Sequence, residues 1–175
     1  MHLLEIGCGN GANLLELLRI GFAPENLVAN ELLAERVAQA QKNLPAAIRL
    51  HAGDASLLDF ADKSFDIVYQ STVFTSLLDT NFKKKLSIEM WRWVKPGGGI
   101  LWYDFTYNNP KNNDVRGISV SSIGELFPEA KIDVRRVTLA PPISRNVCKI
   151  HPAFYSFLNA LPFLRTHVIC WIGKS

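Results

Sequence analysis

The chain has 175 residues, of which 48% are hydrophobic and 20% are charged, and its formal net charge is +3. This length allows one domain with a sizeable core, and so small a net charge does not indicate a nucleic-acid partner. The cysteines, Cys8, Cys148 and Cys170, show no C-x-x-C spacing, so neither a disulfide framework nor a metal site is predicted. We expect a cytoplasmic protein, with neither export nor a membrane span.

The first stretch, from Leu3 to Leu14, predicts a buried strand, a glycine-rich turn and then a helix. Gly7, Gly9 and Gly11 allow the positive φ values of a tight turn, and they remove the Cβ atoms that would keep a ligand away from the backbone. The helix N-terminus adds unpaired N–H groups. The spacing also fits the dinucleotide fingerprint G-x-G-x-x-G/A. A nucleotide-like cofactor is therefore predicted here.

An acidic residue, Glu5, precedes the first glycine by two positions. The run Glu5-x-Gly7-x-Gly9-x-Gly11 resembles motif I of the class I (Rossmann-like) S-adenosylmethionine-dependent methyltransferases, in particular the type 11-like members. A carboxylate beside the turn would repel a phosphate but attract the ammonium and sulfonium groups of S-adenosylmethionine. The resemblance implies that this cofactor contacts Glu5, Gly7, Cys8, Gly9 and Gly11.

A second acidic residue, Glu31, follows a short apolar strand predicted at 27–30 and precedes a helix predicted at 33–43. A carboxylate at the end of the second strand of a doubly wound sheet can accept hydrogen bonds from both ribose hydroxyls. Leu32 would then lie against the adenine ring. Glu31 could alternatively, or in addition, stabilise the start of the helix through the helix dipole.

Asp54 and Ala55 follow a third strand, predicted at 48–50. In the family that the chain resembles, a Gly-Asp pair at this point places the carboxylate near the adenine amino group, and the next backbone N–H faces a ring nitrogen. The resemblance therefore implies cofactor contacts for Asp54 and Ala55. Asp54 could instead cap the segment at 56–60.

The fourth predicted strand, at 65–70, leads into a loop at 71–76. Ligands of open α/β sheets bind outside the carboxyl ends of the strands. We therefore expect Gln70 and Ser71 to offer backbone groups to the methionine moiety, and Phe74 to form a wall of the transfer site. The loop has no Asp/Asn-Pro-Pro-Tyr motif, which argues against methylation of adenine or glutamine nitrogen.

A helix predicted at 81–94 ends at a Lys-Pro-Gly-Gly turn that is typical of the family, and a fifth strand is predicted at 100–105. The polar loop at 106–117 is unusually long, and such loops beyond strand ends are often functional. We take it as the substrate-side loop, with Tyr107, Asn108, Asn109 and Arg116 as candidate substrate contacts. A solvated connection is the alternative.

The last third of the chain predicts a strand at 131–139, a break at Pro141-Pro142, a helix at 153–161 and a strand at 167–172. This tail resembles the antiparallel sixth and seventh strands of the family, whereas a nicotinamide-binding domain would continue with parallel strands. We expect the apolar segment at 154–164 to pack on the sheet. A lid, or a membrane-surface contact that receives a lipid-linked substrate, is the alternative.

The predicted fold class is α/β: a Rossmann-like doubly wound, mostly parallel sheet with an antiparallel C-terminal strand pair, in strand order 3-2-1-4-5-7-6. We expect residues 1–175 to form a single domain without the N-terminal helices that such methyltransferases generally carry upstream of the first strand.

The predicted function is methyl transfer from S-adenosylmethionine to a small-molecule or glycan acceptor, at oxygen. Alignment and exclusion of water can supply most of the acceleration, and a hydroxyl acceptor must also lose its proton. Asp104 is the first candidate for the base and His167 the second. The alternatives are an RNA or protein methyltransferase and a non-catalytic S-adenosylmethionine-binding module. The oligomeric state is left open.

Overall fold

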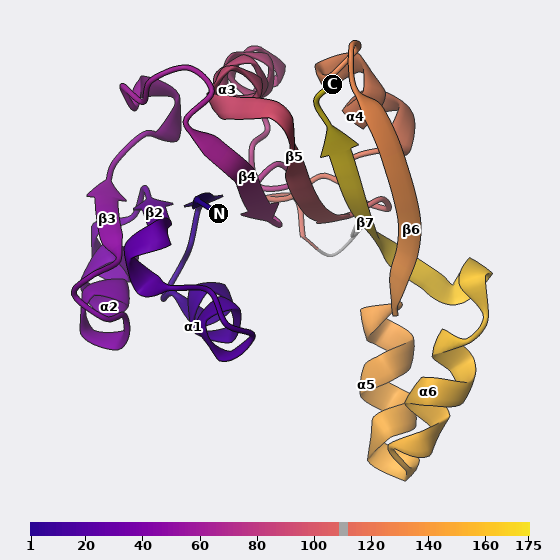
Figure 1. Ribbon diagram of the computed structural model, residues 1–175. Coiled ribbons are helices and arrows are strands. Elements are labelled where there is room, and N and C mark those ends of the chain that lie inside the picture. Colours follow the sequence, from indigo (N-terminus) through magenta and orange to yellow (C-terminus); the bar gives the residue numbers. More distant parts are fainter. Residues whose placement is uncertain (109–111) are drawn as a thin grey trace.

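The computed structural model describes residues 1–108 and 112–175, and these residues form a seven-stranded sheet flanked by helices (Figure 1). The strand order is β3-β2-β1-β4-β5-β7-β6, which confirms the prediction. The first five strands are parallel to one another, and β7 runs antiparallel to both β5 and β6. The strands are β1 Leu3–Ile6, β2 Leu27–Glu31, β3 Arg49–Ala52, β4 Phe65–Ser71, β5 Val94–Phe105, β6 Lys131–Leu139 and β7 Arg165–Gly173.

The helices bury apolar side chains on both faces of this sheet. One core cluster joins the sheet to α3 and α4 through Met90, Trp93 and Ile123, and a second joins it to α1 and α2 through Leu14 and Ala40. The central strands β1 and β2 are buried along their whole length, as expected for parallel strands covered on both sides. The helices are α1 Ala12–Arg19, α2 Ala34–Asn43, α3 Thr80–Trp93, α4 Val120–Leu126, α5 Pro141–Ile150 and α6 Ala153–Asn159.

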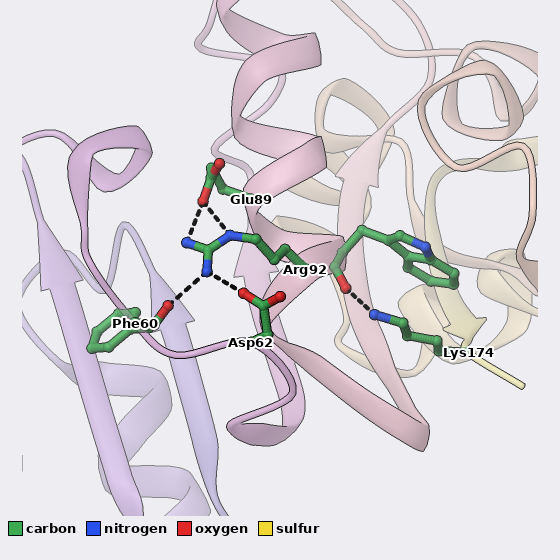
Figure 2. Close-up of polar contacts among 6 residues, drawn as sticks. Phe60, Asp62, Glu89, Arg92 and Lys174 are labelled. Carbon is green, nitrogen blue, oxygen red and sulfur yellow. Dashed lines mark hydrogen bonds and ion pairs between the residues drawn. The ribbon is translucent and has the colours of Figure 1, made fainter.

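Helix α3 is fixed to the loop before β4 through Arg92 (Figure 2). The guanidinium donates through Nη1 to the carbonyl of Phe60 (2.8 Å) and to Asp62, and through Nε and Nη2 to Glu89 Oε2 (2.9 and 2.7 Å). Glu89 lies three residues earlier on the same face of α3, and its contact holds the Arg92 side chain in the orientation that reaches the loop. These contacts hold the β3–β4 connection against the helix.

Several elements in the second half of the chain differ from the predicted ones. Pro141 and Pro142 do end β6, but they also occupy the first turn of α5, where proline needs no N–H partner and its fixed φ suits the helix. Strand β5 begins at Val94, six residues earlier than expected, and passes through the glycine turn. The short helix α4 was not predicted either, because its seven residues carry little periodicity.

The expectation that the segment at 154–164 packs on the sheet is wrong. Helices α5 and α6 form a hairpin that projects from the ends of β6 and β7, apart from α3 and α4 (Figure 1). No residue of α5, of α6 or of the turn at Pro162–Leu164 is buried, and Phe157 is 69% exposed. The other helices already cover the sheet, so α5 and α6 pack mainly on each other and, within the sheet, on β6.

Candidate cofactor and acceptor site

The glycine turn after β1 has the backbone that its sequence predicts. Gly7, Gly9 and Gly11 all have positive φ, at 66°, 59° and 88°. A Cβ on Gly7 would lie 2.6 Å from Val73 Cγ2, and one on Gly11 would lie 2.7 Å from the Leu44 side chain. A Cβ on Gly9 would meet no atom within 4 Å. Gly7 and Gly11 therefore allow close packing inside the protein, whereas Gly9 leaves open space for a ligand.

Glu31 connects the second strand to the glycine turn. Its Oε2 accepts a hydrogen bond from the N–H of Gly9 (2.8 Å), and its Oε1 accepts one from the N–H of Leu33 (2.9 Å). The side chain is only 4% exposed, while the neighbouring Leu32 is 62% exposed. A carboxylate has about four lone-pair positions, so Glu31 keeps acceptor capacity for two hydroxyls while its orientation stays fixed.

Glu5 has an unusual environment for a carboxyl group. Its side chain is fully buried, Oε1 accepts a hydrogen bond from Asn13 Nδ2 (2.7 Å), and Oε2 has no partner. Burial raises the pKa of Glu5 to about 7, against the lowering effect of Asn13 and with a further increase from Glu31. A buried carboxylate oxygen without a partner is costly unless a cation or a donor reaches it. The free oxygen of Glu5 is therefore a candidate contact for a cationic or donor group of a ligand.

Cys8 and Asn30 hold the turn through backbone atoms. The N–H of Cys8 donates to the carbonyl of Asn30 (2.9 Å), and the carbonyl of Cys8 accepts from Gly11 (2.9 Å). Burial raises the pKa of the Cys8 thiol to about 12, so it stays neutral at physiological pH. Asn30 Nδ2 also donates to the carbonyls of His51 (3.2 Å) and Gly53 (2.9 Å). The sequence reasoning missed Asn30, although a polar residue in an otherwise apolar strand was a usable signal.

The alternative role considered for Asp54 is present in the structure. Asp54 Oδ1 accepts a hydrogen bond from the N–H of Ser56 (2.7 Å) and so caps the short turn at Ala55–Leu57. Gly53 donates its N–H to the carbonyl of Glu31 (2.9 Å), which brings this loop beside the end of β2. Asp54 and Ala55 thus lie just after β3, beside the end of β2 that carries Glu31, and capping engages only one oxygen of Asp54.

Asp104 lies at the centre of a buried network beneath the loop that follows β4. Its Oδ1 accepts from Thr75 Oγ1 (2.5 Å), and its Oδ2 accepts from Gln70 Nε2 (3.3 Å). Gln70 Oε1 in turn accepts from the N–H of Val73 (3.0 Å). Asp104 is fully buried, and burial raises its pKa to about 6 despite the hydrogen bonds from Thr75 and Gln70. The network fixes the loop that starts at Ser71. Thr75 was not predicted, because no motif marks it.

His167 and Asp104 do not lie together. Asp104 pairs with Val168 across the strands, and His167 pairs with Phe105, so the two side chains point to opposite faces of the sheet. The His167 ring stacks on Tyr103 with centroids 5.2 Å apart, and burial lowers its pKa. The structure therefore offers no Asp104–His167 pair for proton transfer.

The predicted substrate contacts divide into three groups. Phe74, expected to form a wall of the transfer site, is instead fully buried and packs against Trp102 with centroids 4.4 Å apart. Tyr107 is 55% exposed and Arg116 is exposed, while Asn108 Oδ1 accepts from the N–H of Gly117 (2.9 Å) and closes the base of the loop. Asn109 lies outside the described residues.

The substrate-side loop is attached to the loop after β4. The N–H of Arg116 donates to the carbonyl of Thr75 (2.8 Å), and Thr75 contacts Asp104. Gly117 permits the return of the chain, since a Cβ there would lie 2.7 Å from the carbonyl carbon of Tyr107. Both loops thus meet at the carboxyl ends of β4 and β5. The carboxyl ends of β1 and β2, which carry the predicted cofactor contacts, lie at the same edge of the sheet.

Comparisons with known proteins place this site in a family. The family model described as a methyltransferase domain matches residues 4–102. A sterol 4-C-methyltransferase of Caenorhabditis elegans is 27% identical over 116 residues, which are 65% of this chain and 34% of the relative. A sterol 24-C-methyltransferase of Yarrowia lipolytica is 28% identical over 128 residues, which are 66% of this chain and 32% of the relative. The chain thus spans about one third of the length of these curated relatives.

The fold agrees with this match. The crystal structure of an S-adenosylmethionine-dependent methyltransferase from Methanosarcina mazei superposes with a TM-score of 0.69 at 18% identity, covering 99% of this chain and 92% of the other. Within that fold, Glu5, the glycine turn and Glu31 lie together at the carboxyl ends of β1 and β2. The chain therefore belongs to the methyltransferase domain family, within the Rossmann-like class I that uses S-adenosylmethionine.

Proposed function

We propose that this chain transfers the methyl group of S-adenosylmethionine to a small acceptor with an apolar body. The observation that carries the cofactor part is the free Oε2 of Glu5, buried beside a glycine turn whose Gly9 faces open space. The acceptor part is supported by the exposed aromatic residues of the α5–α6 hairpin and by the sterol methyltransferases among the relatives. Oxygen as the acceptor atom stays a prediction.

The residues of the site hold the cofactor by complementary hydrogen bonding and charge. Glu31, already oriented by Gly9 and Leu33, accepts from the ribose hydroxyls, and Glu5 in its ionised form accepts from the ammonium group. Asp54 and the N–H of Ala55 face the adenine edge. S-adenosylmethionine, when bound, supplies an activated methyl group. The protein contributes the alignment of the acceptor and the exclusion of water.

Asp104 acts in this proposal as a positioning residue. Both of its oxygens already accept hydrogen bonds, and its side chain has no solvent-exposed surface. It orders Gln70 and Thr75, which in turn fix Val73 and Arg116 at the acceptor side. A direct role as general base would require the acceptor hydroxyl to reach this buried carboxyl group.

Calorimetric titration with S-adenosylmethionine, S-adenosylhomocysteine and NAD tests the cofactor assignment. We expect the two S-adenosyl ligands to bind and NAD not to bind, and Glu31→Ala to weaken binding at least about tenfold, or about 1.4 kcal/mol. Glu35→Ala is the matched control, because Glu35 is exposed on the first turn of α2. Binding of NAD alone would overturn the assignment.

A transfer assay with labelled S-adenosylmethionine then tests the acceptor class. The panel contains a sterol, a quinol, a soluble sugar and a transfer RNA, each analysed for the methylated product. We expect the methyl group on the sterol or the quinol. Label on the sugar would favour the glycan acceptor, and label on the RNA would move the chain to a different class of methyltransferase.

A further inference from the structure

The α5–α6 hairpin, residues 140–164, has an apolar surface that no other part of the described chain covers. Ile150 and Phe163 are each 76% exposed, Phe157 is 69% exposed and Phe154 is 47% exposed. Phe154 and Phe157 are three positions apart on α6, so they lie on the same side of that helix. Large apolar side chains gathered in one exposed segment indicate an interaction surface rather than a folding requirement.

The hairpin also carries basic residues and no acidic ones. All 16 Asp and Glu residues of the chain lie at or before Asp133, and the rest of the chain carries only basic charges. On the hairpin, Arg145 and Lys149 are exposed on α5, whose first turn contains no acidic residue. Because they are four positions apart, they share a helix face. The basic residues after Asp133 are Arg135, Arg136, Arg145, Lys149, Arg165 and Lys174.

The position of the hairpin relates this surface to the candidate site. Strands β5 and β6 both run antiparallel to β7, so they point in the same direction. The pairs Phe105–His167 and Leu139–Arg165 place the carboxyl ends of β5 and β6 at one edge of the sheet. The hairpin therefore leaves the sheet at the edge that carries Asp104 and the loop at 106–117, and Figure 1 shows it projecting away from the strands.

We propose that the α5–α6 hairpin docks on the surface of an anionic lipid bilayer. Phe154 and Phe157 enter the boundary between headgroups and acyl chains, while Arg145 and Lys149 face the lipid phosphates. This combination of exposed aromatic residues and basic charge is the one that interfacial helices use. In the described residues no helix is long and apolar enough to cross a membrane.

Docking in this orientation brings the acceptor edge of the sheet to the bilayer. An apolar acceptor could then reach the transfer site from the membrane along the apolar surface of the hairpin. This consequence rests on the proposed function, whereas the docking itself does not, because it depends only on the surface of the hairpin.

Flotation with vesicles tests the proposal on the full chain. The vesicles are made of phosphatidylcholine alone or of phosphatidylcholine mixed with phosphatidylglycerol. We expect the protein to float with the anionic vesicles and not with the neutral ones. The double variants Phe154→Ser with Phe157→Ser, and Arg145→Gln with Lys149→Gln, should each lower the bound fraction at least about fivefold.

Matched controls remove the same groups elsewhere on the surface. Ile88→Ser removes an apolar side chain that is 64% exposed on α3, and Lys84→Gln with Lys85→Gln removes two exposed charges from the same helix. Both controls should bind vesicles like the wild type. Titration with S-adenosylhomocysteine should give the same affinity for all variants, so that a failure of docking is distinguished from a failure of the cofactor site.

A fluorescent probe on Cys148 reports the depth of the contact. Cys148 is exposed on α5, whereas Cys8 and Cys170 are buried, so an environment-sensitive dye can be attached selectively. We expect a blue shift with anionic vesicles. Absence of flotation, flotation that the aromatic variants leave unchanged, or displacement of the protein from vesicles by RNA would each overturn the proposal. So would a concentration-dependent dimer that the aromatic variants abolish.

Discussion

The amide of Gln70 and the carboxylate of Asp104 form a buried hydrogen bond between the carboxyl ends of adjacent strands, with Nε2 and Oδ2 3.3 Å apart. This contact orients the Gln70 amide, because Nε2 must face Asp104 for Oε1 to accept from the N–H of Val73. The loop at the acceptor side thus depends on a pair of polar residues that lie inside the core.

The substitution Asp104→Asn should destabilise the fold. In this variant the side-chain oxygen accepts from Thr75, so the side-chain NH2 group points toward Nε2 of Gln70. Two hydrogen-bond donors then face each other. We expect a loss of about 1–3 kcal/mol in the free energy of unfolding, measured by urea denaturation. Thr75→Val, which leaves one oxygen of Asp104 without its donor, should cost a similar amount.

Kinetics of the same variant separate positioning from base catalysis. If Asp104 positions the loop, the value of kcat in Asp104→Asn should fall by less than about tenfold, and KM for the acceptor should rise. A fall in kcat of about 100-fold or more with KM unchanged would instead assign Asp104 the role of base.

Gly9 and Gly97 provide a matched pair for testing the glycine turn. Both have positive φ, at 59° and 79°, and a Cβ on either would meet no protein atom within 4 Å. Gly9→Ala and Gly97→Ala should therefore each cost about 1–2 kcal/mol in stability. The cofactor affinity should fall at least about tenfold only in Gly9→Ala, since only there does the methyl group enter the proposed ligand space. Equal affinities in the two variants would contradict the site.

The raised pKa of Glu5 predicts a pH dependence of stability. Folding favours the protonated carboxyl, so this contribution is fully present below pH about 4.5 and is lost as the pH rises through about 7. Relative to Glu5→Gln, the wild type should lose stability across this range, as measured by the midpoint of thermal unfolding. S-adenosylmethionine should reduce the loss, because its ammonium group stabilises the ionised form. Parallel pH profiles for the two proteins would refute the assignment.

Arg92 should contribute more to stability than an ordinary surface ion pair. Its guanidinium contacts Glu89, Asp62 and the carbonyl of Phe60, and that carbonyl would lose its charged donor on substitution. We expect Arg92→Ala to lower the free energy of unfolding by about 1–3 kcal/mol in urea denaturation. Arg19→Ala, which breaks a highly exposed pair with Glu16, should change it by less than about 0.5 kcal/mol.

Local patterns in the sequence were sufficient for most of the sheet. Strands β1, β2, β4 and β5 contain apolar runs, and β6 alternates between polar and apolar residues. With the turn at Gly7, Gly9 and Gly11, these patterns resemble a known family, and the topology was predicted from that resemblance. Helix α5 was missed because a proline pair ends a strand and begins a helix with the same backbone constraint. The exposure of the two helices after β6 depends on how the other helices cover the sheet, and no local pattern predicts it.

The candidate site could be predicted only where a local motif marks its residues. The glycine turn and Glu31 were each marked in this way, but the hydrogen bond between Gly9 and Glu31 and the network of Asp104, Gln70 and Thr75 join residues 22 to 34 positions apart. Phe74 illustrates the limit. An aromatic residue in a loop is expected to be accessible, yet this one is drawn into the core by its contact with Trp102.

The contact between Gly7 and Val73 joins the turn after β1 directly to the loop after β4, with no space for even a methyl group between them. A shift of either segment must therefore displace the other, because close-packed atoms cannot absorb it. Occupancy of one subsite should then change the affinity of the other, and by the same factor in both directions. The two substrates would consequently bind with cooperativity that is transmitted by a single valine side chain packed on a glycine.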